Sequence, residues 1–392
     1  MDTEDVTLRR RLLRMGVAIF FSYLSVAVAL PVVSMHVGGT LGLANWLGGL
    51  AVGVAFVSTI LSRGYAGYFA DARSPKGCAM WGLLLYMAAA GICLLSSGDW
   101  LPGSLSYALL LCGRLVLGVG ESMALVGMTS WHISLIGPRH SGRILSAVGM
   151  AMYGAFAVGG PLGLEVYERH GFGTLMCLSL LLPLLGGSLL LGVRDAAAQR
   201  NAATEKSFLW VVRVIWRQGA VVCLQGVGFA VLGAFISLHF KSRGWPHAGW
   251  GLTCFGSGFV LCRLLFGALP DKIGGVRLAS CSLAVELLGQ SLLWLGTDVS
   301  TALAGALLTG LGCSMVFPAM GVEVVRRVPP ELRGTAFGGF AAFQDVAYAF
   351  SAPVAGWLAD AHGYPVVFLM GALAAALGLT ITICMRNEAA RY

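Results

Sequence analysis

Two residues of opposite charge, Arg114 and Glu121, lie inside an apolar stretch that runs from about residue 104 to residue 136. Their separation of seven residues is nearly two turns of an α-helix, so both side chains share one face, about 10 Å apart along the axis. A charged side chain at the centre of a bilayer costs about 2.5 to 3.5 kcal/mol on insertion scales. Such a pair must therefore face protein or a watery cavity, where a carboxyl group can take up and release protons.

The composition indicates that the whole chain lies in a membrane. Of its 392 residues, 57% are hydrophobic and only 11% are charged, whereas soluble proteins carry about 25% charged residues. Its repeated apolar stretches of about 20 residues are each long enough to cross the hydrocarbon core as a helix. The sequence predicts an all-α integral membrane protein with twelve transmembrane helices, at residues 15–37, 44–70, 78–97, 104–136, 143–168, 172–193, 216–240, 248–270, 277–297, 300–325, 335–360 and 364–385.

The basic residues predict the orientation of these helices. They gather at both termini and in every second loop, whereas the intervening loops carry only Arg169, Lys241 and Arg243. By the positive-inside rule, both termini are then cytoplasmic, and we expect a multi-pass protein of the cell inner membrane. The net charge of +8 is explained by this loop distribution. We therefore expect a monomer in the lipid bilayer with no nucleic-acid partner.

The residue types that bind metals or cofactors show no suitable pattern. The ten cysteines fall almost all within the apolar stretches, without a CxxC or a Cys/His cluster, which is typical of buried apolar thiols. A phosphate-binding GxxxxGK[ST] motif is absent from the sequence, which disfavours an ATP-driven pump. We expect no metal, no cofactor and no enzymatic activity. An intramembrane enzyme or a membrane receptor remains the alternative from another functional class.

The chain contains two copies of one six-helix design. We assign residues 1–193 to an N-terminal bundle, 194–215 to a cytoplasmic linker and 216–392 to a C-terminal bundle. The stretch GYFADARSPKG at 67–77 matches GALPDKIGGVR at 267–277. Transporters built from such parallel repeats bind substrate near the membrane midplane, at the interface of the repeats.

A second match relates the charged stretch to its counterpart in the other half. GVGESM at 118–123 matches GLGCSM, which begins 192 residues later at position 310. At this offset Glu121 corresponds to Cys313, and Arg114 corresponds to Ala306. Because the second copy lacks both charges, the pair is not a general requirement of the bundle. The pair therefore indicates a function that is specific to the N-terminal half.

Over essentially its whole length the chain resembles the major facilitator superfamily. The resemblance is carried by the loop GYFADARSPKG, by its partner GALPDKIGG and by the arginine of GRLVLGVGES. It implies a secondary transporter that works by alternating access on a small molecule and protons. It also implies a gating role for the loop residues and for basic residues that could pair with them. These residues are Gly67, Asp71, Arg73, Lys76, Arg143, Gly267, Asp271 and Arg333.

A finer resemblance suggests the direction of transport. GRLVLGVGES together with GGPLG is similar to a bacterial exporter branch that contains drug and sugar efflux permeases and opine-metallophore exporters. This resemblance implies proton antiport that expels a small organic metabolite or drug, an opine-type metallophore included. The alternative within transport is a proton symporter that imports a sugar or an organic acid. A structural ion pair, or a substrate contact by Glu121, is the other interpretation of the charged stretch.

Further polar side chains at membrane depth are candidates for the transport path. Asp345 lies near the centre of its apolar stretch and is the second candidate for proton coupling, with hydrogen-bonded packing as the alternative. Glu286 also lies in mid-stretch, but the resemblance places its helix at the periphery, so we expect packing or an oligomer contact. Glu323 is expected to form a salt bridge with the arginines that follow it. The candidates for the substrate cavity are Tyr23, Phe156, Gln225, Gln344 and Tyr348.

Overall fold

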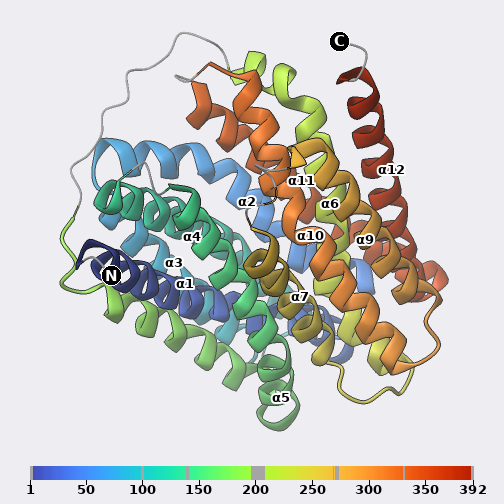
Figure 1. Ribbon diagram of the computed structural model, residues 1–392. Helices are drawn as coiled ribbons and strands as arrows, with labels where there is room; N and C mark the ends of the chain where they lie inside the picture. The colour runs from blue at the N-terminus through green and yellow to red at the C-terminus, as the bar shows by residue number, and fades with distance from the viewer. Residues whose placement is uncertain are drawn as a thin grey trace. The chain divides into compact units, whose positions relative to one another are not determined.

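The computed structural model describes residues 3–98, 101–137, 141–195, 208–267, 269, 273–329 and 332–389, and Figure 1 shows a bundle of α-helices. The first half of the chain forms α1 (Thr3–Met35), the π-helical turn η1 (His36–Thr40), α2 (Asn45–Ala72), α3 (Pro75–Leu95), α4 (Gly103–Ile136) and α5 (Ser141–Leu190). The second half forms α6 (Phe208–Ser242), α7 (Trp250–Phe266), α9 (Gly275–Leu295), α10 (Val299–Arg327), α11 (Arg333–His362) and α12 (Pro365–Ala389).

The lengths of the helices match a membrane protein. Among the described residues, nine helices are long and apolar enough to cross a bilayer, and α7 is a shorter apolar helix. Helix α5 has 50 residues and breaks at Gly171, where a φ of 79° lies in the left-handed region that glycine adopts without a steric penalty. It therefore contains two of the predicted spans, 143–168 and 172–193. The all-α membrane fold predicted from the sequence is confirmed.

Two helices begin well before their predicted spans. Helix α1 begins at Thr3, whereas its span was predicted from residue 15. Helix α6 begins at Phe208, inside the predicted linker 194–215. Val211 and Ile215 on this extension are fully buried in an apolar core that also includes residues of α9, α10 and α11. Packing against these helices, and not the width of the bilayer, explains why α6 starts early.

The helices form two compact units. Unit 1 comprises Met1–His36 and Val54–Asn201, and unit 2 comprises Val37–Gly53 and Ala202–Tyr392. In unit 1, α1 packs along α5, and α3 packs along α4, as can be followed in Figure 1. In unit 2, α9 packs against α10 and α12, while α6 packs against α11.

The first turns of α2 belong to unit 2, although the sequence places them in the half 1–193. A Cβ atom at Gly49 would lie only 2.1 Å from the Ala352 carbonyl oxygen of α11, so glycine is what permits this close approach. The Asp360 carboxylate of α11 accepts hydrogen bonds from the Asn45 backbone amide at 3.0 Å and from the Asn45 side chain at 2.7 Å. It thereby caps the N-terminus of α2.

The sequence repeat is also a repeat of helix packing. A Cβ atom at Gly118 of α4 would lie 1.8 Å from the Ala55 carbonyl oxygen in unit 1. A Cβ atom at Gly310 of α10 would lie 2.0 Å from the Phe255 carbonyl oxygen in unit 2. The two contacts are related by 192 residues (310 − 118) and 200 residues (255 − 55), which are the offsets of the two sequence matches.

Candidate functional site

The carboxyl group of α4 meets polar side chains from other helices of unit 1. Glu121 is half-buried, and the Tyr23 hydroxyl of α1 donates a hydrogen bond to its Oε1 at 3.2 Å. Tyr23 and Tyr86 of α3 are both buried, and Tyr86 interacts electrostatically with Glu121. Arg63 of α2 brings a positive charge close to Tyr23. We call Tyr23, Tyr86 and Glu121 the N-terminal polar cluster.

Arg114, the cation of the same helix, lines a cavity inside unit 1. Its side chain is only 3% exposed. The cavity holds about 20 Å³, which is room for one water molecule, and α1, α3, α4 and α5 form its walls. Ser25, Ser179 and Cys93 place polar groups on these walls. Glu121 interacts electrostatically with Arg114, so both charges of α4 act within the interior of unit 1.

The groups around Glu121 and its burial act on its charge in opposite directions. The Tyr23 hydroxyl and the neighbouring arginine charges stabilise an ionised carboxylate. Removal from water has the opposite effect, because it favours the neutral form of a carboxyl group. A movement of Tyr23 or Arg114, or the arrival of a charged solute, would shift this balance.

Several residues predicted for a substrate cavity lie in unit 2. The Gln344 side chain donates a hydrogen bond from Nε2 to Gln225 Oε1 at 3.3 Å, which joins α11 to α6. Asp345 and Tyr348, on the same helix as Gln344, are buried. Phe156, predicted for the same cavity, is buried on α5 in unit 1. The structure therefore brings Gln225 and Gln344 together, and the roles of all five residues stay predictions.

A second polar cluster, which was not predicted, is buried in unit 2. Gln225 of α6, Glu286 of α9 and Cys313 of α10 form it, and we call it the C-terminal polar cluster. The Cys313 thiol interacts with both other side chains. Glu286 is 0% exposed, which agrees with the packing expected for it and not with the oligomer contact that was the other expectation. The sequence held a signal for this cluster, because Glu286 lies 200 residues after Tyr86 (286 − 86), at the offset of the loop match.

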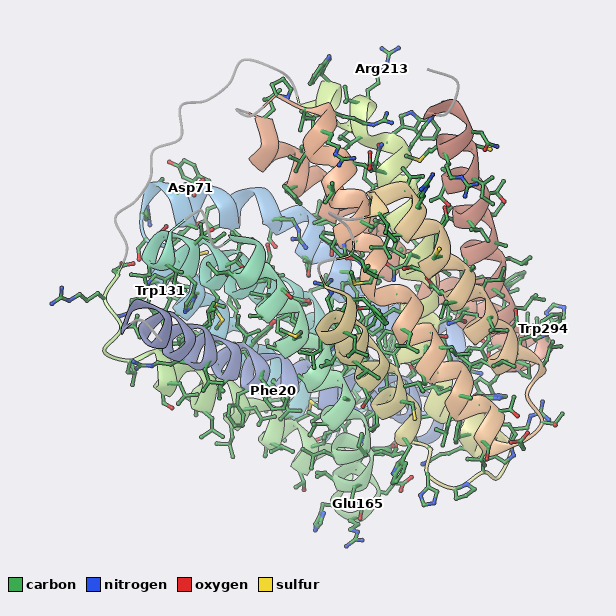
Figure 2. The ribbon with its side chains drawn as sticks, viewed as in Figure 1. Phe20, Asp71, Trp131, Glu165, Arg213 and Trp294 are labelled. Carbon is green, nitrogen blue, oxygen red and sulfur yellow. The ribbon has the colours of Figure 1, made fainter. Side chains whose placement is uncertain are left out.

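The predicted gating residues of the first half surround the connection between α2 and α3. Asp71 is exposed near the C-terminal end of α2 (Figure 2), and Gly67 lies one turn earlier. Arg73 lies over the Phe69 ring, with 5.5 Å between its guanidinium carbon and the ring centroid. These contacts place the loop beside its own helix, and its gating role stays a prediction.

Lys76 connects the start of α3 to the segment that follows α5. Its Nζ donates a hydrogen bond to the Val193 carbonyl at 2.7 Å and lies 5.6 Å from the ring centroid of Trp131, which Figure 2 labels on α4. The Trp131 indole in turn donates to the Arg194 carbonyl at 2.9 Å. The segment at 193–194 is therefore held inside unit 1 by two side chains.

The remaining predicted gating residues are described only in part. Gly267 ends α7, while Asp271 lies outside the described residues. The side chains of Arg143 and Arg333 also lie outside the described part of the chain. The pairing of these arginines with the loop aspartates stays a prediction. The salt bridge predicted for Glu323 is confirmed, because its Oε1 lies 3.2 Å from Arg326 Nη1.

Comparison with known proteins identifies the family. The sequence model described as Major Facilitator Superfamily matches residues 15–248 and 246–391. The chain belongs to this superfamily. An uncharacterized MFS-type transporter of Salmonella typhimurium is 42% identical over 371 residues, which cover 94% of this chain and 95% of the relative. An uncharacterized MFS-type transporter of Burkholderia mallei is 36% identical over 375 residues, which cover 95% of this chain and 91% of the relative.

A solved structure shows the same fold. The crystal structure of the human organic anion transporter MFSD10 matches with a TM-score of 0.72 at 16% identity, over 97% of this chain and 100% of that one. The fold match and the family match agree over nearly the full length. This MFS protein is a multi-pass membrane protein and a secondary transporter.

Proposed function

We propose that this MFS transporter exports a small organic solute in exchange for protons, and that Glu121 carries the exchanged proton. The main support is the environment of Glu121, a half-buried carboxyl group that accepts a hydrogen bond from Tyr23 and interacts with the buried Arg114. Intramembrane carboxyl groups that face the interior of a helix bundle commonly belong to proton or substrate paths. The similarity of GRLVLGVGES to the exporter branch supports the outward direction.

Competition for one carboxyl group explains the exchange. Ionised Glu121 accepts the hydrogen bond from Tyr23 and can attract a cationic or hydrogen-bond-donating group of a solute. A bound proton removes the negative charge and weakens both interactions. Solute and proton therefore exclude each other, and an inward proton gradient drives the solute out. Amphipathic or zwitterionic metabolites, cationic drugs and opine-type metallophores have groups that suit this site.

Proton release by the purified transporter tests the coupling. In weakly buffered detergent, a panel of cationic dyes, sugars and amino-acid-derived chelators is added while the pH is recorded. We expect one compound class to release protons from the wild type and none from Glu121→Gln. The matched control is Glu165→Gln, which removes an exposed carboxylate of unit 1 that pairs with Arg169 and should leave the release unchanged.

Three other results would change the assignment. Solute binding without proton release, or equal release from wild type and Glu121→Gln, contradicts coupling at Glu121. Loss of release in Asp345→Asn, with normal release in Glu121→Gln, would move the coupling to unit 2. In inside-out vesicles an imposed proton gradient should drive solute uptake into the vesicle; transport in the opposite direction would identify an importer.

A further inference from the structure

The N-terminal and C-terminal polar clusters occupy equivalent positions in the two units. Tyr86 acts on Glu121 across α3 and α4, as Glu286 acts on Cys313 across α9 and α10. In both units the third side chain comes from the first helix of the repeat. At the two offsets of the sequence matches, the corresponding residues are Tyr86 and Glu286 (286 − 86 = 200) and Glu121 and Cys313 (313 − 121 = 192). Tyr23 and Gln225 lie on equivalent helices. Each cluster contains one carboxyl group, but on a different helix.

The backbone contacts confirm that these positions are equivalent. A Cβ atom at Gly120 of α4 would lie 3.1 Å from the Tyr86 backbone nitrogen. A Cβ atom at Gly312 of α10 would lie 2.4 Å from the Glu286 backbone nitrogen. The same helix crossing therefore places Tyr86 in unit 1 and Glu286 in unit 2.

The Glu286 carboxyl group differs from that of Glu121 in its burial and in its hydrogen bonding. It is fully buried, and within the described part of the chain neither of its oxygens makes a hydrogen bond of ordinary geometry. Buried polar groups in native proteins are nearly always hydrogen-bonded. An ionised carboxylate that has only a thiol, a weak donor, beside it is far less stable in an apolar interior than the neutral acid. The geometry therefore favours a protonated Glu286.

The neighbouring helices leave space for this carboxyl group and little else. A Cβ atom at Gly228 of α6 would lie 2.3 Å from Glu286 Oε1. Gln290, one turn along α9, donates a hydrogen bond to the Gly228 carbonyl at 3.2 Å. A Cβ atom at Gly371 of α12 would lie 2.3 Å from Gln290 Oε1. Glycines on α6 and α12 thus make room for the side chains of Glu286 and Gln290. Among the described residues, these contacts do not provide the set of oxygen ligands that a metal ion such as Ca²⁺ requires.

Among the residues that the structure describes, the groups that face Glu286 carry no charge. From α10 the Cys313 thiol faces it, and this thiol is the titratable group that acts on Glu286 among the described residues. Helix α6 presents Gly228, and α12 presents Gly371 to the adjacent Gln290. A proton is therefore the species that neutralises this carboxyl group.

We propose that Glu286 is a proton-binding site of unit 2, and that its proton exchanges by way of the Cys313 thiol, which takes up one proton as it gives up another. The Cys313 thiol interacts with Glu286 and with the Gln225 amide, and Gln225 accepts a hydrogen bond from Gln344. In exchange, one proton leaves the carboxyl group as another replaces it, so the charge of the site is unchanged. The transporter then has one titratable carboxyl group in the polar cluster of each unit. This site is independent of the coupling proposed for Glu121.

Infrared spectroscopy of the full-length protein in liposomes tests the site. A neutral carboxylic acid has a C=O stretching band that is distinct from carboxylate and amide bands and that shifts when D₂O replaces H₂O. We expect Glu121→Gln, which removes any contribution from Glu121, to show such a band at neutral pH, and the double variant Glu121→Gln/Glu286→Gln to lack it. A Glu121→Gln variant without the band, or a band that persists unchanged in the double variant, overturns the site. No solute is added, so failure here is distinct from failure of the antiport.

Two further measurements test the exchange and the chemical class of the ligand. Cys313→Ala should keep the band but slow its shift in D₂O severalfold; an unchanged rate overturns the path by way of Cys313. A wild-type band that never shifts in D₂O overturns exchange altogether. Loss of the band on addition of Na⁺ at constant pH would identify a metal-ion site instead.

A labelling experiment covers the case in which Glu286→Gln does not fold. Carbon-13 labelling of glutamate in Glu121→Gln should shift the band, and an unshifted band overturns its assignment to glutamate.

Discussion

The two polar clusters form at equivalent helix crossings but differ in the groups that surround their carboxyl groups. In unit 1 the carboxyl group of Glu121 is half-buried, with a hydroxyl donor from Tyr23 and the positive charge of Arg114 acting on it. In unit 2 the carboxyl group of Glu286 is fully buried beside a thiol and uncharged groups. Equivalent helix crossings can therefore support an ionisable carboxylate in one unit and a neutral acid in the other, because side chains and not the backbone set the local electrostatics.

The largest expected effect comes from placing a positive charge at position 286. Glu286→Lys would bury a cation without a partner, and we expect a loss of about 3–5 kcal/mol in the free energy of unfolding. Glu286→Gln, which is neutral and of the same shape, should change it by less than about 1 kcal/mol. Thermal unfolding in detergent, followed by tryptophan fluorescence, measures both. The exposed Glu165→Lys is the control, with an effect within about 0.5 kcal/mol.

A glutamine variant as unstable as the lysine variant would contradict the neutral acid. It would mean that the ionised form of Glu286 makes an interaction that the fold requires. The difference between the two clusters would then be one of partners and not of protonation state.

The next largest effect is a difference in stability between alanine substitutions at the equivalent helix crossings of the two units. Gly312→Ala places a Cβ atom 2.4 Å from the Glu286 backbone nitrogen, so α9 and α10 must move apart, at a cost of about 1–3 kcal/mol. Gly120→Ala places its Cβ atom no closer than 3.0 Å to a neighbouring atom and should cost less. Unfolding midpoints of the two variants test this order. Gly338→Ala, at a helical site with no neighbour within 4 Å among the described residues, should be neutral or stabilising.

A smaller effect distinguishes the hydrogen bonds of the two units. At alkaline pH, where the proposed mechanism leaves Glu121 ionised, a double-mutant cycle of Tyr23→Phe and Glu121→Gln should give a coupling energy of about 1.5 kcal/mol, because the acceptor is charged. A cycle of Gln225→Leu and Gln344→Leu should give about 0.6 kcal/mol, the usual value for neutral polar pairs between membrane helices. Equal coupling energies at alkaline pH would contradict a hydrogen bond from Tyr23 to an ionised Glu121.

The smallest effect concerns the start of the equivalent helices α4 and α10. Asp298 caps α10, accepting hydrogen bonds from the Thr301 hydroxyl at 2.6 Å and the Thr301 amide at 2.9 Å. These bonds lower the pKa of the Asp298 carboxyl. Its contribution to stability is therefore complete above the ordinary aspartate pKa and is lost as the pH falls through the lowered value. Pro102, which precedes α4, makes no side-chain cap.

Melting temperatures measured over a range of pH test this difference. Asp298→Ala should melt slightly below the wild type at neutral pH, and the two should converge on acidification. Pro102→Ala should differ from the wild type by the same amount at every pH. A constant gap for Asp298→Ala would show that the cap acts without its charge.

The predictions from the sequence succeeded where local composition decides the outcome. The apolar stretches predicted helices because any such stretch must satisfy its backbone hydrogen bonds internally in lipid. The two sequence offsets also predicted the packing repeat, as the contacts of Gly118 and Gly310 show. The early start of α6 at Phe208 was not predicted, because it depends on burial of Val211 against other helices.

The function of single side chains was harder to predict. Tyr86 was not predicted as a site residue, because a single tyrosine in an apolar helix does not indicate a polar site unless its neighbours in space are known. Glu286 was assigned to packing or to an oligomer contact because the family resemblance placed its helix at the periphery. Its burial depends on which face of α9 meets Gly228 and Cys313, and this face cannot be read from the residues of α9 alone.

A membrane protein of apolar helices in two related halves could be predicted from the residues in order, because hydrophobicity and repeats are properties of the linear chain. Three features depend on packing in three dimensions: the contact of Tyr23 with Glu121, the packing of the first turns of α2 within unit 2, and the glycines of neighbouring helices around Glu286. These contacts join residues that are far apart in the chain. Their electrostatic consequences arise only when helix packing removes the side chains from water.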